Sequence, residues 1–136
     1  MDTKKIVIYS DGGARGNPGP AGIGAVLYDS EKNIIAEISE YLGEATNNQA
    51  EYQAIISALE KAQELKAEEL ECYLDSELVV KQLSGEYKVK NAGLAPLFIK
   101  IYNLKHNFKK VSFNHVRREF NKEADALANQ AMDNKK

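Results

Sequence analysis

The stretch YSDGGARGNPGPAGIGAVLY, residues 9–28, runs from the end of one apolar segment into the start of another. The first segment, KKIVIYSD (4–11), has the length and composition of a buried strand, and it ends on a carboxylate. A loop of Gly, Pro and Asn follows, and AGIGAVLYD (21–29) predicts a second strand. Because an aspartate beside such a loop is usually a turn former, a function for Asp11 requires other reactive residues nearby.

The rest of the chain predicts an alternation of strands and helices. Further strands are predicted at 34–42, 70–75 and 110–116, and helices at 46–67, 76–85, 94–108 and 121–132. Thr46 and Gln49 have the spacing of a capping box, and Asn121 suits the N-cap of the last helix. The first three strands predict an antiparallel meander, whereas the later strands follow helices and should pair in parallel. We therefore expect an α/β fold, one domain over residues 1–136, with a five-stranded mixed sheet in the order β-β-β-α-β-α-α-β-α.

Charge is unevenly distributed along the 136 residues. The net charge of −2 argues against a strongly basic nucleic-acid-binding protein. Residues 1–80 hold 6 Lys/Arg and 15 Asp/Glu, a balance of −9, whereas residues 81–136 hold 12 and 5, a balance of +7. These halves are either ordinary solvated faces or a metal-binding acidic centre beside a phosphate-binding surface.

The single cysteine and the absence of long apolar runs bear on location. Cys72 cannot form an internal disulfide, which is typical of the reducing cytoplasm, and its expected place is a buried strand position. No run approaches the length of a membrane span, and no signal segment opens the chain. We expect a cytoplasmic protein with no membrane partner.

Four carboxylates stand at positions where their elements could converge. Asp11 and Asp75 end two strands that are expected to be parallel, and parallel strands end at the same edge of a sheet. Glu51 and Asp125 lie near helix N-termini, at the edges of the apolar stripes. Each acid alone could be a turn former, a helix cap or a partner of the helix dipole. Together they would repel unless cations neutralise them, and an oxygen-only set suits Mg²⁺ or Mn²⁺.

Four blocks of sequence resemble the four conserved blocks of type 1 ribonuclease H, in the family's order and spacing. They are YSDGGARGNPGPAGIGAVL, TNNQAEYQAIISAL, LDSELVVKQL and FNKEADALANQA, and the resemblance extends from about Ile6 to Ala131. It implies a metal-dependent endonuclease that hydrolyses the RNA strand of an RNA/DNA hybrid, leaving a 5′-phosphate and a 3′-hydroxyl. It also implies a catalytic set that holds two Mg²⁺ ions, with Mn²⁺ as a substitute: Asp11, Glu51, Asp75 and Asp125.

The same resemblance implies roles for these acids and for a set of substrate-binding residues. Asp11 would bridge both ions, Asp75 and Asp125 would hold the ion on the nucleophile side, and Glu51 would hold the other. Asn47 and Asn48 match positions that reach the minor groove, where a 2′-hydroxyl distinguishes RNA. The remaining matches are Gly12, Gly13 and Asn17 in the loop that approaches the RNA, Gln49, Ser76 in the cleft, and Thr46 with Asn91 in a pocket for a DNA phosphate.

Two intervals depart from many bacterial members of that family. Only SGEYKVKNAG (84–93) stands where a lysine- and tryptophan-rich protrusion is common, and the chain has no Trp. The connection HVRREFN (115–121) lacks the usual loop histidine, and His115 is expected to be structural. Compact archaeal-like members look most similar, and Arg118 could take over a phosphate contact at product release. Some such members also cut double-stranded RNA, which the sequence does not exclude.

Two other functions remain open at this level. The first is a hybrid-binding or RNA-binding protein that has lost catalysis, and the presence of all four acids argues against it. The second is a different metal nuclease on a related fold, such as a junction resolvase or transposase core, which would cut DNA. A reverse-transcriptase domain is a further origin, but Met1 leads directly into the first strand, so a free-standing monomer is expected.

Overall fold

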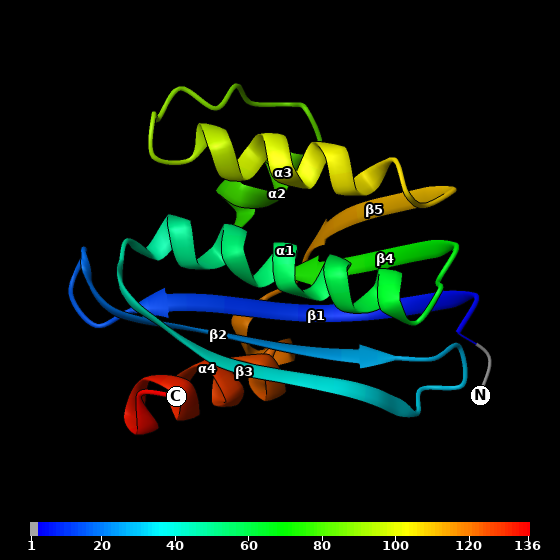
Figure 1. Ribbon diagram of the computed structural model, residues 1–136, viewed down its shortest axis with the longest axis horizontal. Coiled ribbons are helices and arrows are strands. Elements are labelled where there is room, and N and C mark those ends of the chain that lie inside the picture. The colour runs from blue at the N-terminus through cyan, green and yellow to red at the C-terminus, as the bar shows by residue number, and fades with distance from the viewer. Residues whose placement is uncertain (1–2) are drawn as a thin grey trace.

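The computed structural model describes residues 3–136, and all five of its strands belong to a single mixed sheet. Its strands lie in the order β3-β2-β1-β4-β5 (Figure 1). They are β1 (Lys5–Ala14), β2 (Gly19–Tyr28), β3 (Ile34–Ala45), β4 (Glu69–Leu74) and β5 (Lys110–His115). The helices are α1 (Asn47–Glu64), α2 (Glu77–Leu83), α3 (Ala95–Lys105) and α4 (Lys122–Asn134), with a short 3-10 helix η1 (Arg118–Phe120) before α4.

The pairing confirms the predicted α/β fold with its antiparallel meander and parallel crossovers. β1 pairs antiparallel with β2, and β2 with β3. β4 returns through α1 and pairs parallel with β1, bringing Cys72 opposite Ile8. β5 follows α2 and α3 and pairs parallel with β4, so Phe113 lies opposite Cys72. β1, β4 and β5 therefore end at the same edge of the sheet.

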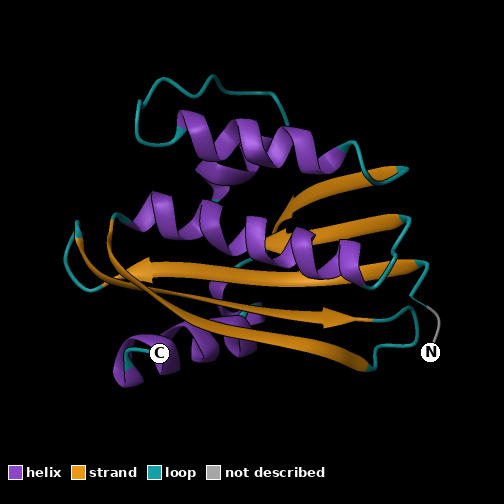
Figure 2. Ribbon diagram, viewed as in Figure 1, coloured by secondary structure: helices purple, strands orange, loops and turns teal. Residues whose placement is uncertain are grey.

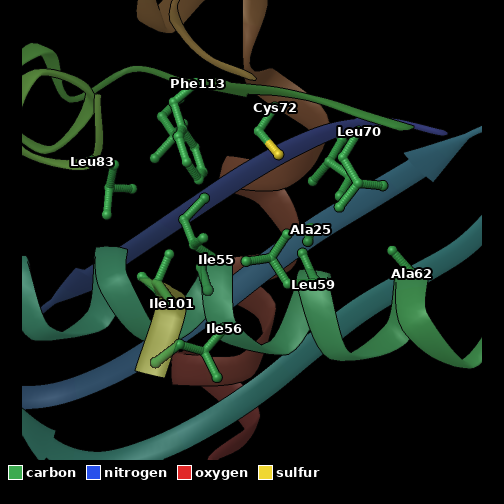
Figure 3. Close-up of a cluster of buried hydrophobic side chains, with 14 of the residues drawn as sticks. Ala25, Ile55, Ile56, Leu59, Ala62, Leu70, Cys72, Leu83, Ile101 and Phe113 are labelled. Carbon is green, nitrogen blue, oxygen red and sulfur yellow. The ribbon is translucent and has the colours of Figure 1, made fainter. Parts of the chain in front are cut away.

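Helices cover both faces of the sheet (Figure 2). α1 packs on the face formed by alternate residues of β1, β2 and β4, where Ile55 and Leu59 meet Ala25 and Cys72 (Figure 3). α4 packs on the opposite face, against β2 and β3. Cys72 is buried as expected, and burial raises the pKa of its thiol to about 12. No helix within residues 3–136 is both long and apolar enough to cross a membrane.

The start of α1 is fixed by the predicted capping box. The Thr46 hydroxyl accepts a hydrogen bond from the Gln49 backbone N–H at 3.1 Å, and the Thr46 N–H donates to the Gln49 side chain at 2.9 Å. These bonds satisfy two donors that a helix N-terminus otherwise leaves unpaired. The helix start is thereby held in one place, one turn before Glu51.

Glycines let both long helices lie directly on the strands. A Cβ at Gly12 would overlap the backbone of Ala50 and would lie 2.7 Å from the Glu51 nitrogen. A Cβ at Gly24 would overlap the Ala124 carbonyl oxygen and would lie 2.6 Å from the Ala128 nitrogen. Such distances are below any van der Waals contact, so a larger residue would force the helices away from the sheet.

Three local features differ from expectation. β1 runs past its predicted end to Ala14, because it stays paired with β2 as far as Ala21. The 3-10 helix η1 was not predicted, since three residues carry too little periodicity to be recognised. The N-cap prediction for Asn121 is wrong as to its side chain, which makes no capping bond and instead donates to the Ser10 carbonyl oxygen.

Gly24→Ala should destabilise the fold by about 1–3 kcal/mol, because the added methyl group meets α4 backbone rather than a side chain that can move. Denaturant unfolding followed by circular dichroism measures the difference. Gly13→Ala is the matched control, since a Cβ there would meet its nearest atom, Asn47 Oδ1, at 3.8 Å. Equal free energies of unfolding for the two variants would show that α4 is not held by close backbone contact.

Candidate metal centre and nucleic-acid cleft

The four acids proposed from the sequence come from four elements and meet near the carboxyl edge of β1 and β4. Asp11 lies in β1, and Asp75 follows the last residue of β4. Glu51 comes from the first turns of α1, which rests on Gly12. Carboxylate oxygens of Asp11, Glu51 and Asp75 all lie within 4.8 Å of one another. Asp125, in the first turn of α4, lines the same cavity.

The cavity has a volume of about 410 Å³ and contains most of the site residues proposed from the sequence. Its lining consists of Asp11, Gly12, Asn47, Asn48, Glu51, Asp75, Ser76, Arg118 and Asp125. The lining therefore combines four acids with asparagines, a serine and an arginine that can donate hydrogen bonds. Arg118 is the one side chain of the lining that always carries a positive charge.

Five of the proposed residues do not line the cavity: Gly13, Asn17, Thr46, Gln49 and Asn91. Gly13 lies in β1 two residues beyond Asp11, and Thr46 and Gln49 form the capping box of α1. Asn91 lies in the exposed connection between α2 and α3, where its side chain accepts a hydrogen bond from the Gly93 N–H at 2.7 Å. Residues 84–94 form no further helix or strand between α2 and α3. The short interval seen in the sequence is therefore an irregular loop.

Asn17 and Asn47 connect the β1–β2 loop to the start of α1. The Ala14 N–H donates to Asn47 Oδ1 at 2.8 Å, and the Asn47 N–H donates to Asn17 Oδ1 at 3.0 Å. Both side-chain oxygens thus serve the fold. The Asn47 Nδ2 group makes no hydrogen bond within residues 3–136 and remains a donor for a ligand.

Burial and mutual repulsion make the acid cluster a poor place for negative charge. Asp11 is 8% exposed, and burial, followed by the charge of Asp75, raises its pKa to about 8. Glu51 is 7% exposed, and burial, followed by the charge of Asp11, raises its pKa well above the usual range. The Gly12 N–H donates to Asp11 Oδ1 at 3.0 Å, but Glu51 Oε2 is buried with no hydrogen-bond partner in the described chain. A cation would supply the missing partner and neutralise the cluster.

Asn121 is a residue of this region that sequence reasoning took for a helix cap. It is fully buried, and its Nδ2 donates to Asp75 Oδ2 at 3.1 Å as well as to the Ser10 carbonyl oxygen at 2.9 Å. An asparagine at a helix start has the same appearance in sequence whether it caps the helix or reaches another strand. Only the tertiary structure, in which Ser10 and Asp75 lie next to the start of α4, distinguishes these two roles.

A larger cavity, of about 560 Å³, lies over another part of the sheet, and both of its acids that come from β4 and the β2–β3 turn, Glu71 and Asp29, have protein partners. Glu71 contacts Lys5 at 3.6 Å and accepts a hydrogen bond from the Tyr73 hydroxyl at 2.9 Å. Asp29 accepts two backbone N–H bonds from its own turn, which lower its pKa. We therefore place the candidate site at the acid cluster, where three carboxylates converge and the buried Glu51 Oε2 has no partner in the described chain.

Comparison with known proteins identifies relatives over nearly the whole chain. The family model described as reverse transcriptase-like matches residues 9–131. A bifunctional protein of Mycobacterium tuberculosis is 45% identical over 95% of this chain, which spans only 36% of that protein. The ribonuclease HI of Halobacterium salinarum is 43% identical over 95% of this chain and 65% of its own, and the crystal structure of RNase H1 from this archaeon superposes with a TM-score of 0.93.

A third relative, LC11-RNase H1, has been solved in complex with an RNA/DNA hybrid. It is 48% identical, the match covers 96% of this chain and 98% of that one, and the TM-score is 0.91. The family model matches most of the chain, and the structural matches cover 96% of it. The chain belongs to the type 1 ribonuclease H family.

Proposed function

We propose that this chain hydrolyses the RNA strand of RNA/DNA hybrids and leaves 5′-phosphate and 3′-hydroxyl ends. The observation that carries the proposal is the convergence of Asp11, Glu51 and Asp75 oxygens within 4.8 Å in a cavity rich in hydrogen-bond donors. The relative solved with an RNA/DNA hybrid, at 48% identity, supports this choice of substrate. We expect the chain to act as a monomer.

The donor set fits divalent metal ions. Carboxylate oxygens suit Mg²⁺ and Mn²⁺, and the partnerless Glu51 Oε2 marks a ligand position that the protein itself leaves unused. Asp11, Glu51, Asp75 and Asp125 would hold two such ions. When bound, the ions activate water for attack on the phosphate and stabilise the charge that develops on the leaving oxygen.

The chain's own residues would orient the hybrid around this centre. Nδ2 of Asn47 is available to a 2′-hydroxyl or a base edge, and Asn48 lines the same wall. The Gly12 and Gly13 backbone lies where the RNA strand would approach, and Asn17 holds that loop to α1. Ser76, the N-cap of α2, follows Asp75 in the chain and also lines the cavity.

A second contact would hold the DNA strand away from the metal centre. The Thr46 hydroxyl accepts from the Gln49 N–H, so its own O–H remains able to donate to a phosphate. Asn91 and Gln49 lie close together, since a Cβ at Gly93 would be within 3.2 Å of both side chains. These three residues are the proposed phosphate pocket, about one helical turn from Glu51.

Asp11→Asn and Asp125→Asn should each lower hybrid cleavage by a factor on the order of 10³ or more, because each removes a metal ligand. End-labelled RNA/DNA hybrid, double-stranded RNA and double-stranded DNA are incubated with Mg²⁺ or Mn²⁺, and the products are resolved on gels. Asp133→Asn, an exposed acid of the same helix paired with Arg15, is the matched control and should cleave normally.

Three outcomes of that experiment decide between the possible functions. Binding of the hybrid without cleavage would favour a non-catalytic protein. Cleavage of DNA without ribose would favour a different nuclease. Cleavage of double-stranded RNA alongside the hybrid would broaden the substrate class.

Asp11→Asn should stabilise the metal-free protein at pH 8 and have little effect at pH 4. The folded-state pKa of Asp11, about 8, lies above the ordinary value of 3.8, so the folded state binds a proton that the unfolded state has lost. The contribution of Asp11 to the free energy of unfolding is therefore most favourable below pH 4 and decreases as the pH rises toward 8. Thermal melts in EDTA at several pH values measure the effect. An unchanged melting temperature for the variant at pH 8 would contradict it.

Arg118→Ala should weaken cleavage of the hybrid by about 10-fold, because the cavity loses a cation that can contact a phosphate. The salt dependence of the Michaelis constant should also become shallower. Arg117→Ala is the matched control, since the Arg117 side chain contacts Glu119 and Phe120 outside the lining. Unchanged turnover and salt dependence in Arg118→Ala would remove this role.

A further inference from the structure

Asn121 is a fully buried polar side chain between β1, β4 and the start of α4. Its Nδ2 group donates two hydrogen bonds, to the Ser10 carbonyl oxygen at 2.9 Å and to Asp75 Oδ2 at 3.1 Å. Ser10 directly precedes Asp11, and Asp75 directly follows β4. One amide nitrogen therefore connects the β1 residue before Asp11 to Asp75, which follows β4.

Backbone hydrogen bonds connect Asn121 to two other charged residues of the cavity, Arg118 and Asp125. Its N–H donates to the Arg118 carbonyl oxygen at 2.9 Å, which closes the turn of η1. Its carbonyl oxygen accepts from the Asp125 N–H at 3.1 Å, which opens α4. Both neighbours line the cavity. Any shift of Asn121 would be transmitted to Asp75, Asp125 and Arg118 together.

We propose that Asn121 is a positioning residue that orients the Asp75 carboxylate and fixes the start of α4 for metal binding. The inference rests on the proposed function, since it concerns the same metal centre. No other group within residues 3–136 donates a hydrogen bond to Asp75, so this bond alone sets the rotation of its carboxylate. The second oxygen of Asp75 is left without a protein donor.

The chemistry of the site explains why an amide stands here. Both acceptors of Asn121 need a donor, and an ionised aspartate at this position could donate to neither. A fifth carboxylate would also add to the repulsion that already raises the pKa of Asp11. Lysine would bring a charge into a fully buried place. A neutral group with two N–H bonds on one nitrogen meets all of these conditions.

The bonding of Asn121 is also unfavourable for stability alone. Its Oδ1 is buried with no hydrogen-bond partner in the described chain, as is the hydroxyl of Ser10. A buried polar atom without a partner loses its hydration and gains no hydrogen bond in return. A capping side chain would have bonded to the free N–H groups of α4 instead. The observed orientation thus favours the acid cluster over the helix end.

The test measures Mn²⁺ binding without substrate, by isothermal titration calorimetry, alongside kcat and KM on the hybrid. Asn121→Ala should weaken Mn²⁺ binding about 10- to 100-fold, as loss of a group that orients a metal ligand commonly does. We expect kcat to fall with it, while KM for the hybrid stays within about 2-fold. Asn121→Ser, which keeps one hydroxyl donor, should recover part of the loss and provides a second variant if the first folds poorly.

Two controls separate positioning from general stabilisation. Ser39→Ala removes the hydrogen bond from the Ser39 hydroxyl to the Leu127 carbonyl oxygen, 2.7 Å, which holds α4 to β3 and involves none of the four acids. It should lower the melting temperature without changing Mn²⁺ affinity. In an Asp75→Asn background, Asn121→Ala should weaken Mn²⁺ binding by much less than it does in the wild type, because the carboxylate it orients is gone.

The outcomes are distinguishable from failure of the proposed function. Asn121→Ala and Asn121→Ser with lower melting temperatures but wild-type Mn²⁺ affinity would overturn the positioning role, as would a full effect in the Asp75→Asn background. A wild-type chain that binds Mn²⁺ but does not cut the hybrid would overturn the proposed activity instead. In that case the Mn²⁺ titrations of the variants still decide what Asn121 does.

Discussion

Repulsion among carboxylates that β1, β4 and α1 bring together, two of them buried, is the constraint that organises the rest of this structure. Parallel pairing of β1 and β4 brings Asp11 and Asp75 to one edge of the sheet. Close backbone contact at Gly12 and Gly24 then brings α1 and α4 near enough to add their own acids. The resulting cluster raises the pKa of its buried members and leaves a glutamate oxygen without a partner. These features are costs in the metal-free chain and become favourable interactions when cations occupy the cluster.

The stability that offsets this cost lies elsewhere in the molecule. α1 packs its apolar face on β1, β2 and β4, and α3 packs on α1, so the core is continuous and lies behind the acids. The acids thus occupy the rim of a well-packed scaffold. Such an arrangement keeps a strained, charged site in a fixed geometry, because the elements that carry it cannot easily move apart. The residues of this hydrophobic core therefore stabilise the geometry of the acid cluster although they are not part of it.

Most of the fold and the acid cluster could be predicted from local pattern. Period-two and period-three-to-four repeats mark the strands and helices, and the choice between antiparallel and parallel pairing follows from which connections contain helices. Asp11 and Asp75 could be placed together because each ends a parallel strand. The contacts of Asn121 could not, since 111 residues separate it from Ser10 in the chain and its position imitates a helix cap. The hydrogen bonds that link Asn17 and Asn47 were hidden for the same reason: they depend on long-range packing rather than on neighbours in sequence.

The hydrogen bonds from Ala14 to Asn47 and from Asn47 to Asn17 bear on the conformational entropy that this region would lose on binding a duplex. Loops that contact nucleic acid commonly lose conformational entropy when they order around it, and this loss subtracts from affinity. Here two hydrogen bonds already connect the β1–β2 loop to a capped helix, so less of this loop would need to become ordered when an RNA strand binds. Recognition would then resemble docking of preformed shapes, with association limited by diffusion and charge rather than by rearrangement of the protein.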